Sequence, residues 1–272
     1  MRTTVSDRRV RPAPASGPLL AALPAAIGLA WAGLLVAELR GAPISHDALA
    51  DGSLPLAPAL GIFGLAWVAM VVAMMLPSAY PAVRAFAAGL PEPGNRMAQV
   101  ARFLAGYVAV WTLFGFALFL GDLGLHAVVD ASPAPDAAHA ALTSGVLIVA
   151  GAFQFTRRKL RCLSRCRQAA EPREAAELAG GAVARGGSGG AVARGGWGSG
   201  GALRVGVGHG LHCLGACWAL MLAVFALASP EVLWMAVFGA AMLYEKAGRH
   251  GLVAVRAAGV ALLAASVVVA LS

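Results

Sequence analysis

Long apolar segments without charged residues make up most of this chain, and they restrict its possible folds more than any other feature. A bilayer core about 30 Å thick requires roughly 20 apolar residues of helix. Six segments have about that length, whereas a seventh, of 13 residues, is short. Helices keep every backbone group hydrogen-bonded in lipid, and no strand periodicity indicates a barrel. We therefore predict an all-α, polytopic transmembrane helix bundle of about seven spans: residues 19–37, 60–83, 103–121, 137–156, 205–228, 232–244 and 252–271.

The positions of lysine and arginine predict the orientation of the bundle, because cytoplasmic loops collect these residues. Twenty of the 21 lysines and arginines precede the first span or lie in or close to every second loop, with Arg256 near the start of the last span, and Arg40 is the exception. The opposite loops carry acidic residues instead: Asp47, Asp51, Asp122, Asp130, Asp136 and Glu231. We therefore expect a cytoplasmic N-terminus in a multi-pass protein of the cell (plasma or inner) membrane. The net charge of +8 then reflects topology, and we expect no nucleic-acid partner.

The same pattern divides the chain into four parts. They are a basic cytoplasmic N-terminal tail (1–18), transmembrane helices 1–4 (19–156), a basic, glycine-rich, flexible cytoplasmic loop (157–204) and transmembrane helices 5–7 (205–272). The glycine-rich stretch of the loop, 171–201, buries too little apolar surface to offset its chain entropy. The basic tail leads into a long span without an obvious cleavage site, so we expect it to be retained.

Four residues with soft side chains follow one another at intervals of four in the fifth span. Each interval is about 6 Å of rise and about 40° beyond a full turn, so the side chains form one winding stripe. The stripe consists of His209, Cys213, Cys217 and Met221, with His212 beside it. Imidazole, thiolate and thioether favour Cu(I) or Zn(II) over Mg(II) or Ca(II). The stripe predicts a soft-metal site, and the alternative is that these residues only fill gaps between helices.

A second pair of cysteines, Cys162 and Cys166, lies in the sequence RKLRCLSRCR just after the fourth span. A helix would place both thiols on one face, and the surrounding bases favour the thiolate that a metal binds. Cytosolic cysteines stay reduced, and a thiol oxidoreductase more typically uses CxxC. We therefore expect metal ligands rather than a disulfide. The basic run also suits an interfacial segment that faces anionic lipid, whatever the cysteines do.

Methionines and prolines mark the second span, WVAMVVAMMLPSAYP. Met70 and Met74 are one turn apart with Met75 adjacent, a spacing that thioether copper relays use. Methionines are also common packing residues, which is the alternative. Pro77 and Pro81 free backbone carbonyls that neighbours or a polar cavity must satisfy.

One carboxylate lies at the end of the short sixth span. Glu245 is followed by Lys246. A carboxylate near the bilayer boundary is costly unless it is functional or paired. We therefore include Glu245 among the candidate metal residues, with an ordinary ion pair at the helix end as the alternative. Three histidines on the expected external side are too scattered to define a site: His46, His126 and His139.

Five sequence blocks occur in order between Trp67 and Gly251: WVAMVVAMMLPSAYP, RFLAGYVAVW, AGAFQFTRRKLRCLSRCR, GHGLHCLGACWALM and LWMAVFGAAMLYEKAGRHG. Together they resemble the bacterial predicted metal-binding integral membrane proteins, which share domain of unknown function 2182. Members are described as copper chaperones, and one supplies copper to a tyrosinase-like oxidase. The resemblance implies a bacterial inner-membrane protein with these metal ligands: Cys162, Cys166, His209, Cys213 and Cys217. It also implies motif positions at Met74, Met75 and Glu245.

The sequence departs from this family at two positions. Ala216 precedes Cys217 where two adjacent cysteines are expected, and Arg158 stands where a proline is common. The first departure leaves one thiolate fewer for a metal.

These observations favour an integral membrane protein that handles copper as Cu(I), with zinc as the alternative metal. It would act as a chaperone or transporter in the lipid bilayer, with a soluble copper donor or a copper-enzyme client as partner. Two other functions stay open: a membrane thiol-disulfide oxidoreductase that uses the same cysteines, and a structural or assembly protein without metal. No nucleophile and base pairing and no phosphate-binding loop is present, so nothing supports a hydrolase or a primary pump, and the copper-handling function that we favour is not an enzyme activity.

Overall fold

The described residues of the computed structural model form helices, with no strand among them. The described residues are 18–41, 49, 54–90, 95–131, 133–170, 199–227 and 231–271. The all-helical expectation is therefore confirmed. The basic tail up to residue 17, most of the glycine-rich stretch (171–198), His46 and the side chain of His126 lie outside this description.

Six helical segments of the described chain are long and apolar enough to cross a membrane, judged by length and composition. They are Pro18–Leu39, Leu56–Ala88, Arg96–Leu125, Asp136–Gln154, Gly201–Ala226 and Gly251–Leu271. These segments correspond to six of the seven predicted spans. The remaining prediction, residues 232–244, falls within helix α10 (Glu231–Ala247), which has 17 residues.

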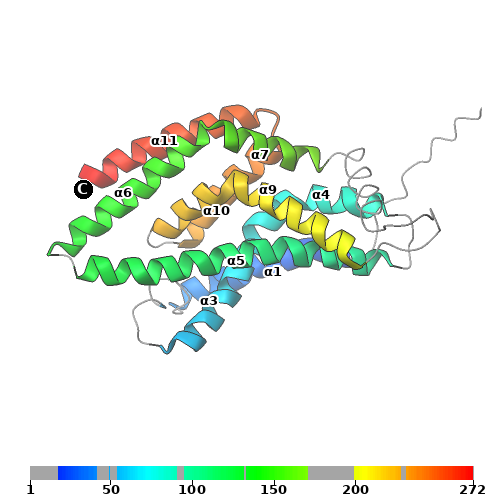
Figure 1. Cartoon of the computed structure of the whole chain (residues 1–272), viewed down its shortest axis with the longest axis horizontal. Helices are drawn as coiled ribbons and strands as arrows, with labels where there is room; N and C mark the ends of the chain where they lie inside the picture. The colour runs from blue at the N-terminus through cyan, green and yellow to red at the C-terminus, as the bar shows by residue number, and fades with distance from the viewer. Residues whose placement is uncertain are drawn as a thin grey trace, which may run out of the picture.

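Two pairs of helices form the frame of the bundle (Figure 1). Helix α5 (Arg96–Asp130) crosses α9 (Ser199–Ala226), while α6 (Pro135–Gln154) runs alongside α11 (Gly251–Leu271). Glycines allow the α5–α9 crossing, because a Cβ on Gly206 would overlap the carbonyl group of Phe103. Small residues in membrane helices allow such close backbone approach. In the other pair, the Ser144 hydroxyl donates a hydrogen bond to the Ser266 carbonyl, 2.9 Å away.

The second predicted span is one continuous helix with a π-helical turn. Helix α3 (Leu56–Met70) leads into η1 (Val71–Met75) and then into α4 (Leu76–Ala88). Pro77 lacks an N–H group, so the Ala73 carbonyl one turn before it loses its usual donor. The indole of Trp31, on helix α1 (Pro18–Leu39), donates to this carbonyl at 3.1 Å. A neighbouring helix therefore satisfies the freed carbonyl, and the π-turn presents Met74 and Met75 to the core.

The start of the loop assigned to residues 157–204 is a helix, α7 (Arg157–Gln168). Thr156 caps this helix, since its hydroxyl accepts a hydrogen bond from the Lys159 N–H. Lys159, Leu163 and Cys166 are buried, and they lie on one face at helical spacing. The flexible-loop prediction therefore does not extend to residues 157–168. The density of bases obscured this buried face in the sequence.

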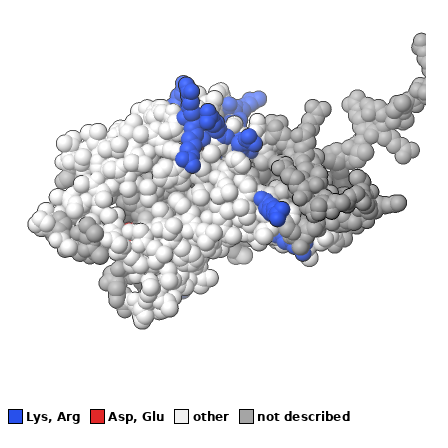
Figure 2. Space-filling model, viewed as in Figure 1, with Lys and Arg blue, Asp and Glu red and all other residues white. Residues whose placement is uncertain are grey.

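Lysines and arginines are unevenly distributed on the face of the molecule that Figure 2 shows. On the face shown in Figure 2, they lie over α7 and the neighbouring end of the bundle. The opposite end, where α11 finishes, shows none of them on this face. This distribution is what a bundle with one cytoplasmic end would present.

Candidate metal centre

The soft-ligand stripe of the fifth span lies on the buried face of α9. Cys213 and Cys217 are 1% and 0% exposed, Met221 is 1% exposed and His209 is 8% exposed. His212 is half-buried, and its Nδ1 lies 2.7 Å from the Gly208 carbonyl of its own helix. The structure therefore confirms the predicted common face of the four residues.

The Cys213 thiol is contacted by side chains from two other helices. Its Sγ lies 2.9 Å from Lys246 Nζ on α10 and 3.1 Å from the Tyr107 hydroxyl on α5. Lys246 Nζ also donates to Ser78 Oγ on α4, 2.9 Å away. The Ser78 hydroxyl in turn donates to the Met75 carbonyl at 2.8 Å. A buried ammonium requires hydrogen-bond acceptors such as Ser78 Oγ and Cys213 Sγ. Cys213 is therefore one of the side chains that hold the Lys246 ammonium inside the bundle.

Helix α7 brings a third thiol to this point. Cys166 is buried, and Cys166 and Cys217 both lie within interaction distance of the Cys213 side chain. We call Cys166, Cys213 and Cys217 the thiol centre. Cys162 is half-buried beside it, packed against α9 where Gly215 has no side chain, because a Cβ there would come 2.7 Å from Cys162 Sγ. The two cysteine pairs predicted from the sequence are therefore adjacent in space.

All four cysteines are free thiols. Within the described part of the chain, no three His, Cys, Asp or Glu side chains are arranged around a common metal position. For the three thiols to bind one ion together, their side chains must therefore rotate. The Lys246 ammonium must also move away from Cys213 Sγ.

Glu245 is paired with a residue that the sequence did not indicate. Its Oε2 accepts a 2.6 Å hydrogen bond from Lys159 Nζ on α7, and the two side chains are 1% and 0% exposed. Arg167, also on α7, donates to the Glu245 backbone carbonyl at 3.3 Å. The neighbour in sequence, Lys246, points to Cys213 instead. Glu245 therefore holds α7 against α10 through an ion pair between helices rather than at the end of one helix.

His209 lies beside the thiol centre in an aromatic setting. Its ring centroid is 5.6 Å from that of Tyr107 and 5.8 Å from that of Phe103, both on α5. Tyr107 contacts both this ring and the Cys213 thiol. These two ring contacts hold the imidazole in place, one turn before Cys213 on α9.

The methionines of the second span separate into two groups. Met74 and Met75 are buried in the π-turn, whereas Met70 is only half-buried on α3. Met74 and Met221 belong to the same packed core as the cysteines. The predicted relay of Met70 followed by Met74 therefore runs from a half-buried methionine packed against this core to one buried inside it.

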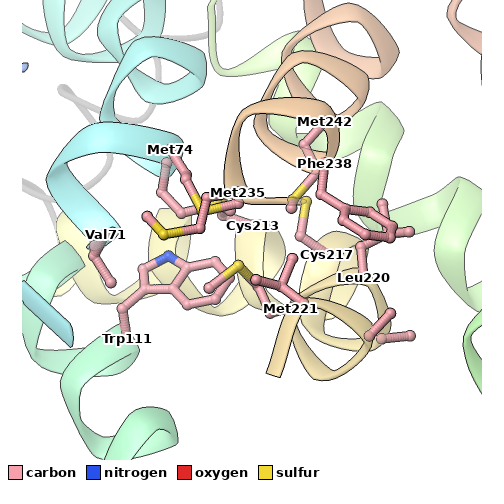
Figure 3. Packing of buried hydrophobic residues seen from close by; sticks show 14 of the residues in the cluster. Val71, Met74, Trp111, Cys213, Cys217, Leu220, Met221, Met235, Phe238 and Met242 are labelled. Carbon is pink, nitrogen blue, oxygen red and sulfur yellow. The ribbon is translucent and has the colours of Figure 1, made fainter. Parts of the chain in front are cut away.

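Sequence reasoning missed one face of α10. Met235, Gly239, Met242 and Lys246 recur at helical spacing along this helix, and the three side chains are buried. Figure 3 shows Met235 and Met242 in the core with Cys217 and Met221. The recurrence of these residues at intervals of four, three and four is the signal in the sequence that indicates this face.

Comparison with known proteins identifies a family. A protein-family model described as "PpoB2: Copper chaperone" matches residues 64–269. This range includes all four cysteines and the whole of α7, α9 and α10. No curated protein and no solved structure matches the chain.

Proposed function

Because the chain belongs to the PpoB2 family of copper chaperones, we propose that it binds Cu(I) within the membrane at the thiol centre and delivers it to a copper enzyme. The observation that carries this proposal is that three free thiols are buried together: Cys166 from α7, and Cys213 and Cys217 from α9. The candidate donors surrounding them are His209, His212 and Cys162. Glu245 supports α7 and is not needed as a ligand.

The donor set fits Cu(I) better than the alternatives. Thiolates and thioethers are soft ligands that select Cu(I). A structural zinc site usually requires four ligands in a tetrahedron, so zinc would need a fourth donor, such as His209 or Cys162, in addition to the three thiols that Ala216 leaves at the centre. Three thiols can hold Cu(I) with a low coordination number. The ion is cargo in this account and leaves when a client takes it.

Lys246 provides a cation for the metal-free state. Its ammonium lies 2.9 Å from Cys213 Sγ and is buried. A cation that binds Cys213 has to displace this ammonium, because the two positive charges repel in a medium of low dielectric constant. Ser78 Oγ, already 2.9 Å from Nζ, gives the displaced ammonium an acceptor. The ammonium stays inside the bundle, so the charge of the incoming Cu(I) is balanced by the protons that the thiols release as they bind it.

Copper would enter from the basic end of the bundle. Cys162 is the most accessible of the four thiols and lies on α7 among arginines: Arg158, Arg161 and Arg165. This positive surface complements an acidic soluble donor. The ion would pass from Cys162 to Cys166 and then to Cys213 and Cys217.

Replacing Cys213 and Cys217 with serine together should remove most of the Cu(I) that the purified protein binds. Serine preserves the shape of the side chain but offers no soft donor. Bound copper per chain is measured after equilibration with a Cu(I) chelator. Cys162→Ser is the matched control, which should retain the copper content and load more slowly. Unchanged copper content in the double variant would refute the thiol centre.

The proposed topology has seven spans with a cytoplasmic N-terminus, so α10 crosses the membrane and the C-terminus lies outside. A reporter that is active only outside the cytoplasm, fused after Ser272, should therefore be active. The same reporter fused within the loop 171–198 should be inactive. Activity confined to the loop fusion would reverse the orientation, and activity in neither fusion would reduce the number of spans to six.

A further inference from the structure

We propose that Met74, Met221 and Met235, from η1, α9 and α10, form a second binding site for Cu(I), deeper in the bundle than the thiol centre. We call these three residues the thioether cluster. The inference rests on the proposed copper function and adds a site to it. It assigns a role to a face of α10 that the sequence analysis did not consider.

The face of α10 that carries Met235 is built around a glycine. Gly239 lies one turn from Met235 and about one turn from Met242, on the same side of the helix. A Cβ at Gly239 would lie 3.5 Å from the Met74 Cγ, so the Met74 side chain packs directly against this glycine. The glycine therefore allows the η1 methionine to lie between the two methionines of α10.

Helix α9 supplies the third thioether. Met221 follows Cys213 by eight residues, which is about 12 Å along the helix. All three members of the thioether cluster are buried, with exposed fractions of 4% or less. Figure 3 shows their side chains in one region of the core, with Cys213 beside Met235 and with Met242 close to Cys217.

Most of the methionines of the chain are concentrated in this core. The chain has eight methionines, and five of them are buried in the one core that also contains the thiol centre: Met74, Met75, Met221, Met235 and Met242. Leucine packs membrane helices equally well and is abundant in this chain. Thioether sulfur adds a soft, neutral donor that leucine lacks.

Trp111 gives the region a further feature suited to a cation. Its indole lies beside the methionines in Figure 3, on α5. It is fully buried. The face of an indole attracts cations. Neutral thioethers with an aromatic neighbour suit a soft monovalent ion and provide none of the oxygen ligands that hard divalent ions require.

A thioether site would bind copper with a different dependence on pH from a thiol site. Thiols must lose a proton to bind a metal, whereas thioethers have no proton to lose. Acidification therefore weakens the thiol centre and leaves the thioether cluster competent. The cluster provides the position to which Cu(I) moves from Cys217 on its way through the bundle.

The test is a titration of the purified, detergent-solubilised full chain with Ag(I), a redox-stable substitute for Cu(I), at neutral and at acidic pH. We expect two equivalents bound at neutral pH and one at acidic pH. The triple variant Met74→Leu, Met221→Leu and Met235→Leu should bind one at neutral pH and none at acidic pH. Leucine approximately conserves the volume. Met97→Leu, at an exposed position on α5, is the control and should match the wild type.

The outcomes separate the two sites. If the triple variant binds as much Ag(I) as the wild type at both pH values, the thioether cluster is refuted and the thiol centre is unaffected. If the Cys213→Ser and Cys217→Ser double variant also binds as much as the wild type, the proposed function itself fails.

Selenomethionine-labelled wild-type protein gives a measurement independent of variant folding. Selenium–silver scattering in its X-ray absorption spectrum supports the cluster, and its absence contradicts it.

Discussion

Glu245→Gln should destabilise the protein by about 3–5 kcal/mol, because it leaves the Lys159 ammonium buried without its counter-ion. The Nζ and Oε2 atoms are 2.6 Å apart, and both side chains are almost completely excluded from solvent. Glutamine keeps the shape of glutamate and removes only the charge. The loss of stability is measured as a lower midpoint of thermal unfolding in detergent.

The double variant Lys159→Met with Glu245→Met distinguishes an ion pair from simple packing. Removing both charges together leaves neither one uncompensated, so the double variant should be more stable than Glu245→Gln. It should also keep α7 in place, since Leu163 and Cys166 remain buried on the same face. A double variant less stable than the single one would show that the charges contribute independently, contrary to the structure.

Gly206→Ala should prevent the close crossing of α5 and α9 and cost about 3 kcal/mol or more. The added Cβ would overlap the Phe103 carbonyl group, which belongs to the backbone and cannot rotate away. Tyr107, one turn further along α5, would move with the helix and lose its 3.1 Å contact with Cys213 Sγ. We therefore expect both a lower unfolding midpoint and weaker Cu(I) binding.

Gly208→Ala is the matched control for this substitution. Gly208 lies two residues away on the same helix, and a Cβ there would meet nothing within 4 Å. Alanine is the better helix former by about 1 kcal/mol, so this variant should be at least as stable as the wild type. Equal effects of the two substitutions would mean that the α5–α9 crossing does not depend on close backbone contact.

The features predicted correctly from the sequence were those set by a single helix. The apolar spans follow from length and hydropathy, and the stripe from His209 to Met221 follows from a period of four residues. Both require only the geometry of one helix. The freed carbonyl one turn before Pro77 followed in the same way, and a neighbouring helix satisfies it through the Trp31 indole.

The features that could not be predicted depend on which helices are neighbours. The partner of Glu245 is 86 residues away in the chain, on a helix that the sequence presented as a basic loop. The contact of Lys246 with Cys213 likewise requires α9 and α10 to present particular faces to each other. A single sequence records the residues of each face but not the pairing between faces, so Lys159, Tyr107 and Lys246 carried no visible signal of a shared site.

The central claim is that thiols from α7 and α9 hold one Cu(I) together. Its most direct test is the copper K-edge X-ray absorption spectrum of the Cu(I)-loaded protein, compared with that of Cys166→Ser. We predict that sulfur scattering dominates the first shell of the wild type and that the sulfur coordination number falls in the variant. A first shell dominated by nitrogen or oxygen, or a spectrum unchanged by Cys166→Ser, would contradict the account.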